Sequence, residues 1–150
     1  MIEEYKIDNS LVDELIKSLD LFKSVNFCVS GTCTVNGFQT GNILKFDSAR
    51  ALINEILKDV IKNKKVECFH VHLIEYFKGG YQKVHNHART EDYSFILYLN
   101  NSDGNTVFKD ELSIKPEKGK LVYFKSDLIH WGEESNLNKK IAVGALKEFF

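Results

Sequence analysis

The second half of the chain consists of short strand-like runs separated by turns, and this pattern most limits the possible folds. From Val66 onward, runs rich in β-branched and aromatic residues follow one another, among them VECFHVHLIEYF, YSFILYLN, KLVYF and KIAVGALKEFF. Turn-forming residues separate the runs at Gly79-Gly80, 102–104, 116–119 and 136–138. Many short strands at close intervals predict a sandwich or barrel rather than alternating strands and helices.

The first part of the chain predicts two helices. Over residues 10–22, apolar residues recur at helical spacing, and Ser10 with Asp13 resembles an N-terminal capping box. A second helix is expected from Asp47 or Ser48 to about Asn63, again from apolar residues at helical spacing.

Between the two helices, the dipeptide Asn36-Gly37 lies in a stretch of alternating polar and apolar residues and predicts a hairpin turn. The length suits one core of useful size. We therefore expect a single domain over residues 1–150, with helical support over about 1–65 and a β core over about 66–150.

Charge and composition narrow the range of partners. The formal net charge is −1, and acidic and basic residues are scattered along the chain, which gives no electrostatic reason to expect nucleic acid or an anionic membrane as partner. No apolar run approaches the roughly 20 residues of a membrane-spanning helix. The polar N-terminal segment and three cysteines without a CxxC pair predict a cytoplasmic protein with reduced thiols.

Three of the five histidines occur where they could share one metal ion. His85 and His87 are two residues apart at the start of a strand segment, so both imidazoles lie on one side of the backbone. His130 follows the apolar strand KLVYF, as a third ligand from a distant strand of a barrel would. Neutral imidazole suits iron, zinc, copper and nickel alike. His70 and His72 lie in mid-strand, where pocket lining or polar surface is the commoner role.

The order of these residues resembles the iron(II)- and 2-oxoglutarate-dependent dioxygenases, particularly their prolyl-hydroxylase-like branch. That family has a tyrosine before a glycine turn, an HxD pair, a strand ending in YLN, a P-x-x-G turn, a distal histidine and a downstream basic residue. The matching segments cover roughly residues 66–150 and are Tyr76 to Gly80, His85-Asn86-His87, Tyr98-Leu99-Asn100, Pro116 with Gly119, His130 and Lys140. The resemblance implies a mainly β fold, a double-stranded β-helix (jelly-roll or cupin-like barrel) with the N-terminal helices packed on it.

For function, the resemblance implies a dioxygenase that uses Fe(II), 2-oxoglutarate and dioxygen to hydroxylate a peptidyl or small-molecule substrate, with ascorbate as a further candidate cofactor. His85 and His130 would be iron ligands, and Lys140 would pair with the distal carboxylate of 2-oxoglutarate. Tyr76 and Tyr98 match positions that family members use to hydrogen-bond the cosubstrate. No catalytic residue is implied beyond the metal centre.

Two assignments stay open in the sequence. Lys139 is the alternative anchor for 2-oxoglutarate. Neighbouring strand residues face opposite sides, and the pattern KKIAVGAL does not show which of the two lysines faces the inside of the barrel. His87 occurs where the family has an aspartate. Three explanations compete. His87 replaces the aspartate in a three-histidine site, or Glu91 or Asp92 reaches the metal and restores a carboxylate ligand, or the site binds metal weakly or does no hydroxylation.

A cupin-type metalloprotein is the rival interpretation. It would hold a metal with His85, His87, Glu91 and His130, which fit the cupin HxHxxxE pattern, and would not use 2-oxoglutarate. Against it, Tyr98 occurs where the cupin motif has a glycine, and the downstream lysine has no role. A non-catalytic binding module with the same barrel is a third interpretation, since a fold alone does not establish an enzyme.

Overall fold

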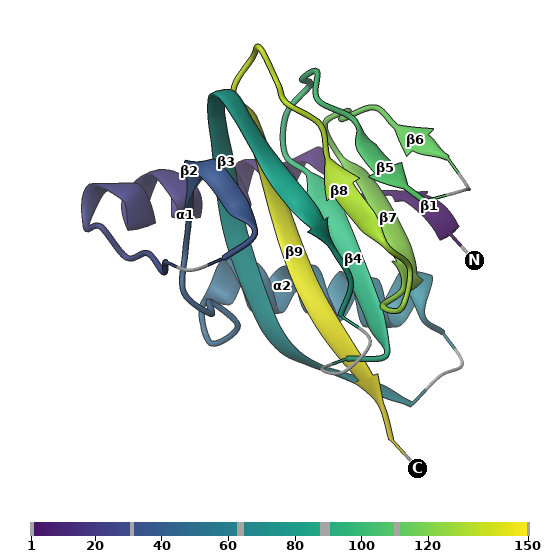
Figure 1. The fold of residues 1–150 in the computed structure, drawn as a ribbon. Helices are drawn as coiled ribbons and strands as arrows, with labels where there is room; N and C mark the ends of the chain where they lie inside the picture. Colours follow the sequence, from purple (N-terminus) through teal and green to yellow (C-terminus); the bar gives the residue numbers. More distant parts are fainter. Residues whose placement is uncertain (1, 31, 63–64, 88–90, 110–111, 150) are drawn as a thin grey trace.

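A curled antiparallel sheet forms the centre of the protein (Figure 1). The computed structural model describes residues 2–30, 32–62, 65–87, 91–109 and 112–149. Over these residues the sheet runs in the order β1-β7-β4-β9-β3-β8-β5-β6, with β2 also paired to β3. The strands are β1 (Ile2–Lys6), β2 (Thr34–Gln39), β3 (Val66–His85), β4 (Tyr93–Tyr98), β5 (Thr106–Phe108), β6 (Ser113–Ile114), β7 (Lys120–Lys125), β8 (His130–Gly132) and β9 (Lys139–Glu148).

The long strand β3 belongs to both halves of this sheet. Its first part, from Val66 to Tyr76, pairs with β9. The chain then bends at Gly79, whose φ of +82° is a conformation that glycine adopts at little cost. The second part pairs with β8 and sets His85 opposite His130. One continuous strand therefore carries the chain from the larger half of the sheet to the smaller half, which confirms the predicted double-stranded β-helix (Figure 1).

Two helices cover the outer face of the larger half (Figure 1). They are α1 (Asn9–Ser24) and α2 (Asp47–Glu55), and α2 continues as the short π-helical segment η1 (Ile56–Val60). The predicted end of this second helix at Asn63 lies outside the described residues. No helix in the described part of the chain is long and apolar enough to span a membrane.

The start of α1 differs from the predicted capping box. Asp8 is the N-cap, and its carboxylate accepts a hydrogen bond from the backbone N–H of Ser10 at 3.0 Å. Asp8 satisfies a backbone N–H of the first turn that has no partner inside the helix. The prediction that Ser10 caps the helix was therefore wrong by two residues.

The N-terminal part adds two strands to the expected helices. β1 pairs with β7, and β2 pairs with β3. The predicted hairpin at Asn36-Gly37 is wrong, because this dipeptide forms a bulge inside β2, where the pairing register shifts and Asn36 has a φ of +53°. A Cβ on Gly37 would lie 2.5 Å from the carbonyl oxygen of Glu75. The glycine thus permits close approach to β3 rather than a chain reversal.

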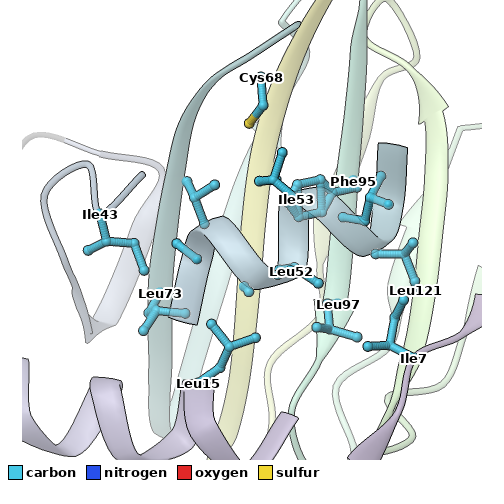
Figure 2. Close-up of a cluster of buried hydrophobic side chains, with 14 of the residues drawn as sticks. Ile7, Leu15, Ile43, Leu52, Ile53, Cys68, Leu73, Phe95, Leu97 and Leu121 are labelled. Carbon is cyan, nitrogen blue, oxygen red and sulfur yellow. The ribbon is translucent and has the colours of Figure 1, made fainter. Parts of the chain in front are cut away.

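The main apolar core lies between the helices and the larger half of the sheet (Figure 2). Leu15 of α1, Leu52 of α2 and Leu73 of β3 have no exposed surface, and neither does Phe95 of β4. Phe95 packs against the backbone of Gly144, where a Cβ would lie 2.1 Å from its ring. This core fixes the helices on the sheet and leaves the opposite, inner face of the sheet to line the barrel.

Substitution of Leu52 by alanine is expected to lower the free energy of unfolding by about 2–5 kcal/mol, because it removes buried methyl groups and leaves a cavity. Urea denaturation followed by circular dichroism measures this change. Leu21 of α1, which is 60% exposed, is the matched control. Leu21→Ala should stay within about 0.5 kcal/mol of the parent, and equal losses for the two variants would contradict this account of the core.

Candidate metal centre

The structure brings His85, His87 and His130 together where β3 ends and β8 begins. One ligand nitrogen from each ring lies within 4.8 Å of the other two. The ring centroids of His85 and His130 are 4.2 Å apart, and those of His85 and His87 are 4.7 Å apart. The two strands are paired at this point, so the sheet itself sets the distance between His85 and His130. The three predicted ligands therefore come within reach of one ion.

Backbone carbonyls orient two of the three rings. Nδ1 of His85 lies 2.7 Å from the oxygen of Lys83, and Nδ1 of His130 lies 2.9 Å from the oxygen of Leu128. A carbonyl only accepts, so each Nδ1 carries the proton and Nε2 keeps a lone pair for a metal. Burial lowers the pKa of His130 to about 3 and also lowers the pKa of His85. Both rings are thus neutral at pH 7, the form that binds a metal.

His87 is in contact with a carboxylate instead. Oε1 of Glu91 lies 3.5 Å from Nδ1 of His87. Burial lowers the pKa of His87 to about 4, with His85 and His70 contributing. This ring is also neutral at pH 7 and can offer Nε2 to a metal.

Neither of the two carboxylates considered as alternative ligands belongs to the histidine cluster. Glu91 is buried, but it is not part of the group that the three histidines form. Asp92 is exposed, and its Oδ2 accepts a hydrogen bond from the backbone N–H of Glu148 at 2.8 Å. Among the described histidines, cysteines and acidic residues, these three imidazoles form the group that could hold one ion.

A cavity of about 430 Å³ opens beside these histidines. All five histidines of the chain line it, including His70 and His72 on the first part of β3. His72 is oriented by the carbonyl oxygen of Thr40, which lies 2.9 Å from its Nδ1. Apolar residues of the inner face line its wall: Ile74, Ile96, Phe124 and Val143. The cavity can therefore admit a ligand to the three histidines and keep much of its surface away from water.

A buried lysine lies in the inner part of the barrel. Lys139 is only 3% exposed, and its Nζ donates a hydrogen bond to the carbonyl oxygen of Gly104 at 2.8 Å. Nζ also lies 5.2 Å from the ring centroid of Tyr76. Burial lowers the pKa of Lys139 to about 8, although Glu133 and Asp103 partly offset this effect. An ammonium in such a place is costly unless an anion meets it.

Lys140 faces the other side of the sheet. It shares a strand face with Ala142, which belongs to the core under the helices, whereas Lys139 shares a face with Ile141 of the inner core. The backbone N–H of Lys140 donates to Asn100. Of the two lysines that the sequence left open, the structure thus places Lys139 on the barrel side of β9 and Lys140 on the helix side.

Both tyrosines singled out in the sequence are buried in the inner core. The hydroxyl of Tyr98 donates to Oγ1 of Thr106 at 2.6 Å. The hydroxyl of Tyr76, with Thr34 nearby, makes no hydrogen bond of good geometry to the described residues. Burial raises the pKa of both hydroxyls. A buried hydroxyl without a partner is unusual and suits a site that takes a polar ligand.

Sequence reasoning missed several residues of the site. Thr106 forms a hydrogen bond with Tyr98, and Ser94 forms one with Glu91. Nothing in the local sequence of Thr106 or Ser94 indicates these contacts. Gly132 had a signal that could have been used, because it follows His130 by two residues and so shares its strand face. A Cβ on Gly132 would lie 3.4 Å from Nζ of Lys139, so the glycine leaves space beside the ammonium.

The described residues fit iron(II) and a dicarboxylate. Three neutral imidazoles lie within reach of one ion and leave coordination positions for other ligands, and imidazole is a common ligand of non-haem iron. A buried ammonium lies further into the same barrel, where a carboxylate would pair with it.

Comparison with known proteins supports the same family. The sequence profile of the 2OG-Fe(II) oxygenase superfamily matches residues 68–145, just over half of the chain. This span includes the three histidines and both lysines. None of the curated proteins matches the sequence.

Solved structures with the same fold cover nearly the whole chain. A prolyl-4-hydroxylase from Pseudomonas putida has a TM-score of 0.75 at 16% identity, covering 99% of this chain and 93% of its own. A viral collagen prolyl hydroxylase from Paramecium Bursaria Chlorella virus-1, in complex with 2OG, has a TM-score of 0.72 at 18% identity, covering 99% and 96%. A prolyl hydroxylase from Trichoplax adhaerens, bound to a peptide of a hypoxia inducible factor, has a TM-score of 0.75 at 14% identity, covering 96% and 82%.

These findings favour the resemblance drawn from the motifs over the cupin interpretation. The neighbours share the double-stranded β-helix over almost all of the chain, and the matching profile spans the histidine cluster. The chain therefore belongs to the 2OG-Fe(II) oxygenase superfamily.

Proposed function

We propose that this protein is an iron(II)- and 2-oxoglutarate-dependent dioxygenase that hydroxylates a peptidyl or small-molecule substrate. The observation that carries the proposal is the cluster of His85, His87 and His130 beside the cavity, with a buried lysine further into the same barrel. The three histidines would hold the iron. When bound, iron with 2-oxoglutarate supplies the oxidation chemistry, and the protein supplies ligand geometry, a dry wall and substrate placement.

Lys139 would pair with the distal carboxylate of 2-oxoglutarate. It takes over the role first expected of Lys140, because its ammonium is buried in the barrel with a backbone carbonyl as its described hydrogen-bond partner. A carboxylate there would return the pKa of Lys139 toward its ordinary value and convert a costly buried charge into an ion pair. The hydroxyls of Tyr98 and Tyr76 are candidates for further hydrogen bonds to the cosubstrate.

The outer part of the cavity would receive the substrate. Its described polar side chains include Thr32, Gln39, His70 and His72. The Trichoplax neighbour was solved with a peptide, which supports peptides as the first substrate class to test. We also propose a cytoplasmic location, since the three free cysteines suit a reducing compartment, and fractionation of cells that express the protein would test it.

Succinate formation from 2-oxoglutarate is the direct test of the proposed function. Purified protein is expected to release succinate and carbon dioxide only when Fe(II), 2-oxoglutarate and dioxygen are all present. Mass spectrometry of the reaction mixture measures the product, and chelation of the metal is the control. Metal binding without any use of 2-oxoglutarate would support a cupin-type protein instead. Failure to bind any divalent metal would leave a non-catalytic module.

A further inference from the structure

We propose that Glu91 acts on the metal centre through His87. It supplies the negative charge that an aspartate ligand would carry, but it does not itself contact the metal. This inference rests on the proposed metal site. It makes Glu91 a positioning residue for His87, in a chain whose HxH pair replaces the HxD pair of the family.

The first argument is the place of Glu91 relative to His87. Oε1 of Glu91 lies 3.5 Å from Nδ1 of His87. His85 and His130 have a backbone carbonyl at the same ring position. All three rings thus have an oxygen at Nδ1, and in the described contacts the oxygen beside His87 belongs to a carboxyl group. A carboxylate behind a metal-binding imidazole fixes its orientation and makes it a more basic ligand.

The second argument is that Glu91 is held in place. Its side chain is only 3% exposed, and Oε2 accepts a hydrogen bond from the hydroxyl of Ser94 at 2.7 Å. The hydroxyl of Ser94 is in turn 2.9 Å from that of Ser126. The backbone N–H of His87 donates to the carbonyl oxygen of Ser126 at 2.8 Å. Ser126 is thus linked to both His87 and the serine that fixes Glu91, so the two side chains keep their relative position.

The third argument is the charge of the site. Two histidines and an aspartate bring one negative charge to the metal, whereas three neutral imidazoles bring none. Glu91 is the described carboxylate on the wall of the cavity, and its Oε1 lies 3.9 Å from Nε2 of His70 as well as beside His87. A charge at this place acts on the metal at short range, in surroundings where water screens it poorly.

Metal affinity measured by calorimetry tests the inference without any use of activity. Metal-free wild-type protein, Glu91→Gln and Asp92→Asn are each titrated with Co²⁺. Glu91→Gln keeps the size of the side chain and removes its charge, so it should weaken binding by about 10–100-fold, the usual cost of losing such a partner of a ligand. Asp92→Asn loses the same charge one residue away and should bind Co²⁺ as the wild type does. Ser94→Ala, which releases Glu91, should weaken binding in the same direction by less.

A second series in the His87→Asp background tests whether Glu91 acts through His87 or simply adds negative charge near the metal. An aspartate at position 87 brings its own charge and has no Nδ1 for Glu91 to contact. In that background, Glu91→Gln should leave Co²⁺ affinity unchanged or raise it. An equal loss in both backgrounds would overturn the inference, and so would a Glu91→Gln protein that binds Co²⁺ as tightly as the wild type. Wild-type protein that binds no Co²⁺ would instead overturn the metal site and the proposed function with it.

Discussion

Replacement of His130 by alanine is expected to abolish metal binding. His130 is only 2% exposed, and its ring meets that of His85 where two distant segments of the chain are paired. Without His130, the remaining ligands His85 and His87 lie on one short segment, and the metal loses its third protein ligand. The loss should exceed the roughly 10–100-fold that removal of an outer partner of a ligand costs.

Metal content after reconstitution with Fe(II) or Co²⁺ measures this effect. His130→Gln is a useful companion, because it fills more of the space beside Phe108 and Phe124 and should lose the metal as completely. His72→Ala is the matched control, since His72 lines the same cavity but lies outside the histidine cluster. Unchanged metal stoichiometry in His130→Ala would refute the assignment.

Replacement of Lys139 by methionine is expected to weaken the binding of 2-oxoglutarate strongly and the binding of metal little. Truncation of one partner of a buried charge pair costs about 2–5 kcal/mol, which corresponds to roughly 30-fold or more in Kd. Methionine keeps the length and apolar stem of the side chain and removes the ammonium. The variant is expected to keep its fold, because an apolar side chain suits the inner core around Ile141.

Titration of the metal-loaded protein with 2-oxoglutarate, together with the KM for this cosubstrate, measures the change. Lys140→Met is the control on the neighbouring residue, and its effect should be small because Lys140 is directed away from the barrel. If Lys140→Met weakens 2-oxoglutarate binding as much as Lys139→Met does, the direction in which each lysine faces from β9 does not explain the loss of binding. The proposed anchor would then be wrong.

The choice between these lysines shows where sequence reasoning reached its limit. Adjacent residues of a strand face opposite sides, and KKIAVGAL is apolar enough on both faces to allow either register. Both faces of β9 are in fact buried, one under the helices and one inside the barrel. The pairing of Lys139 with Tyr76 across the sheet decides the orientation, and that is a tertiary contact no local pattern contains.

The histidines were more accessible to sequence reasoning. A two-residue spacing places His85 and His87 on one side of the backbone whatever the rest of the fold does. His130 required the assumption of a closed barrel, which the alternation of strands and turns supported. The role now proposed for Glu91 was out of reach, because it depends on Ser126, a distant residue that contacts both Ser94 and the backbone of His87.

The N-terminal errors have a similar origin. Asn36-Gly37 is a strong local signal for a hairpin, yet the same residues suit a bulge when another strand passes close by. The neighbouring backbone of Glu75 decided between the two outcomes. The strand β1 was missed because it is a short run at the edge of the sheet whose residues are mostly exposed or half-buried, and its pairing with β7 defines it.

The bend in β3 would also couple metal binding to the stability of the folded protein. Because one strand reaches both halves of the sheet, His85 meets His130 only after long-range pairing is complete, a slow kind of step in folding. The unfolded chain has no such cluster, so by mass action a metal at 100 times its Kd would add about 2.7 kcal/mol to the stability of the native state. A cell short of iron would then hold fewer native molecules as well as fewer active ones.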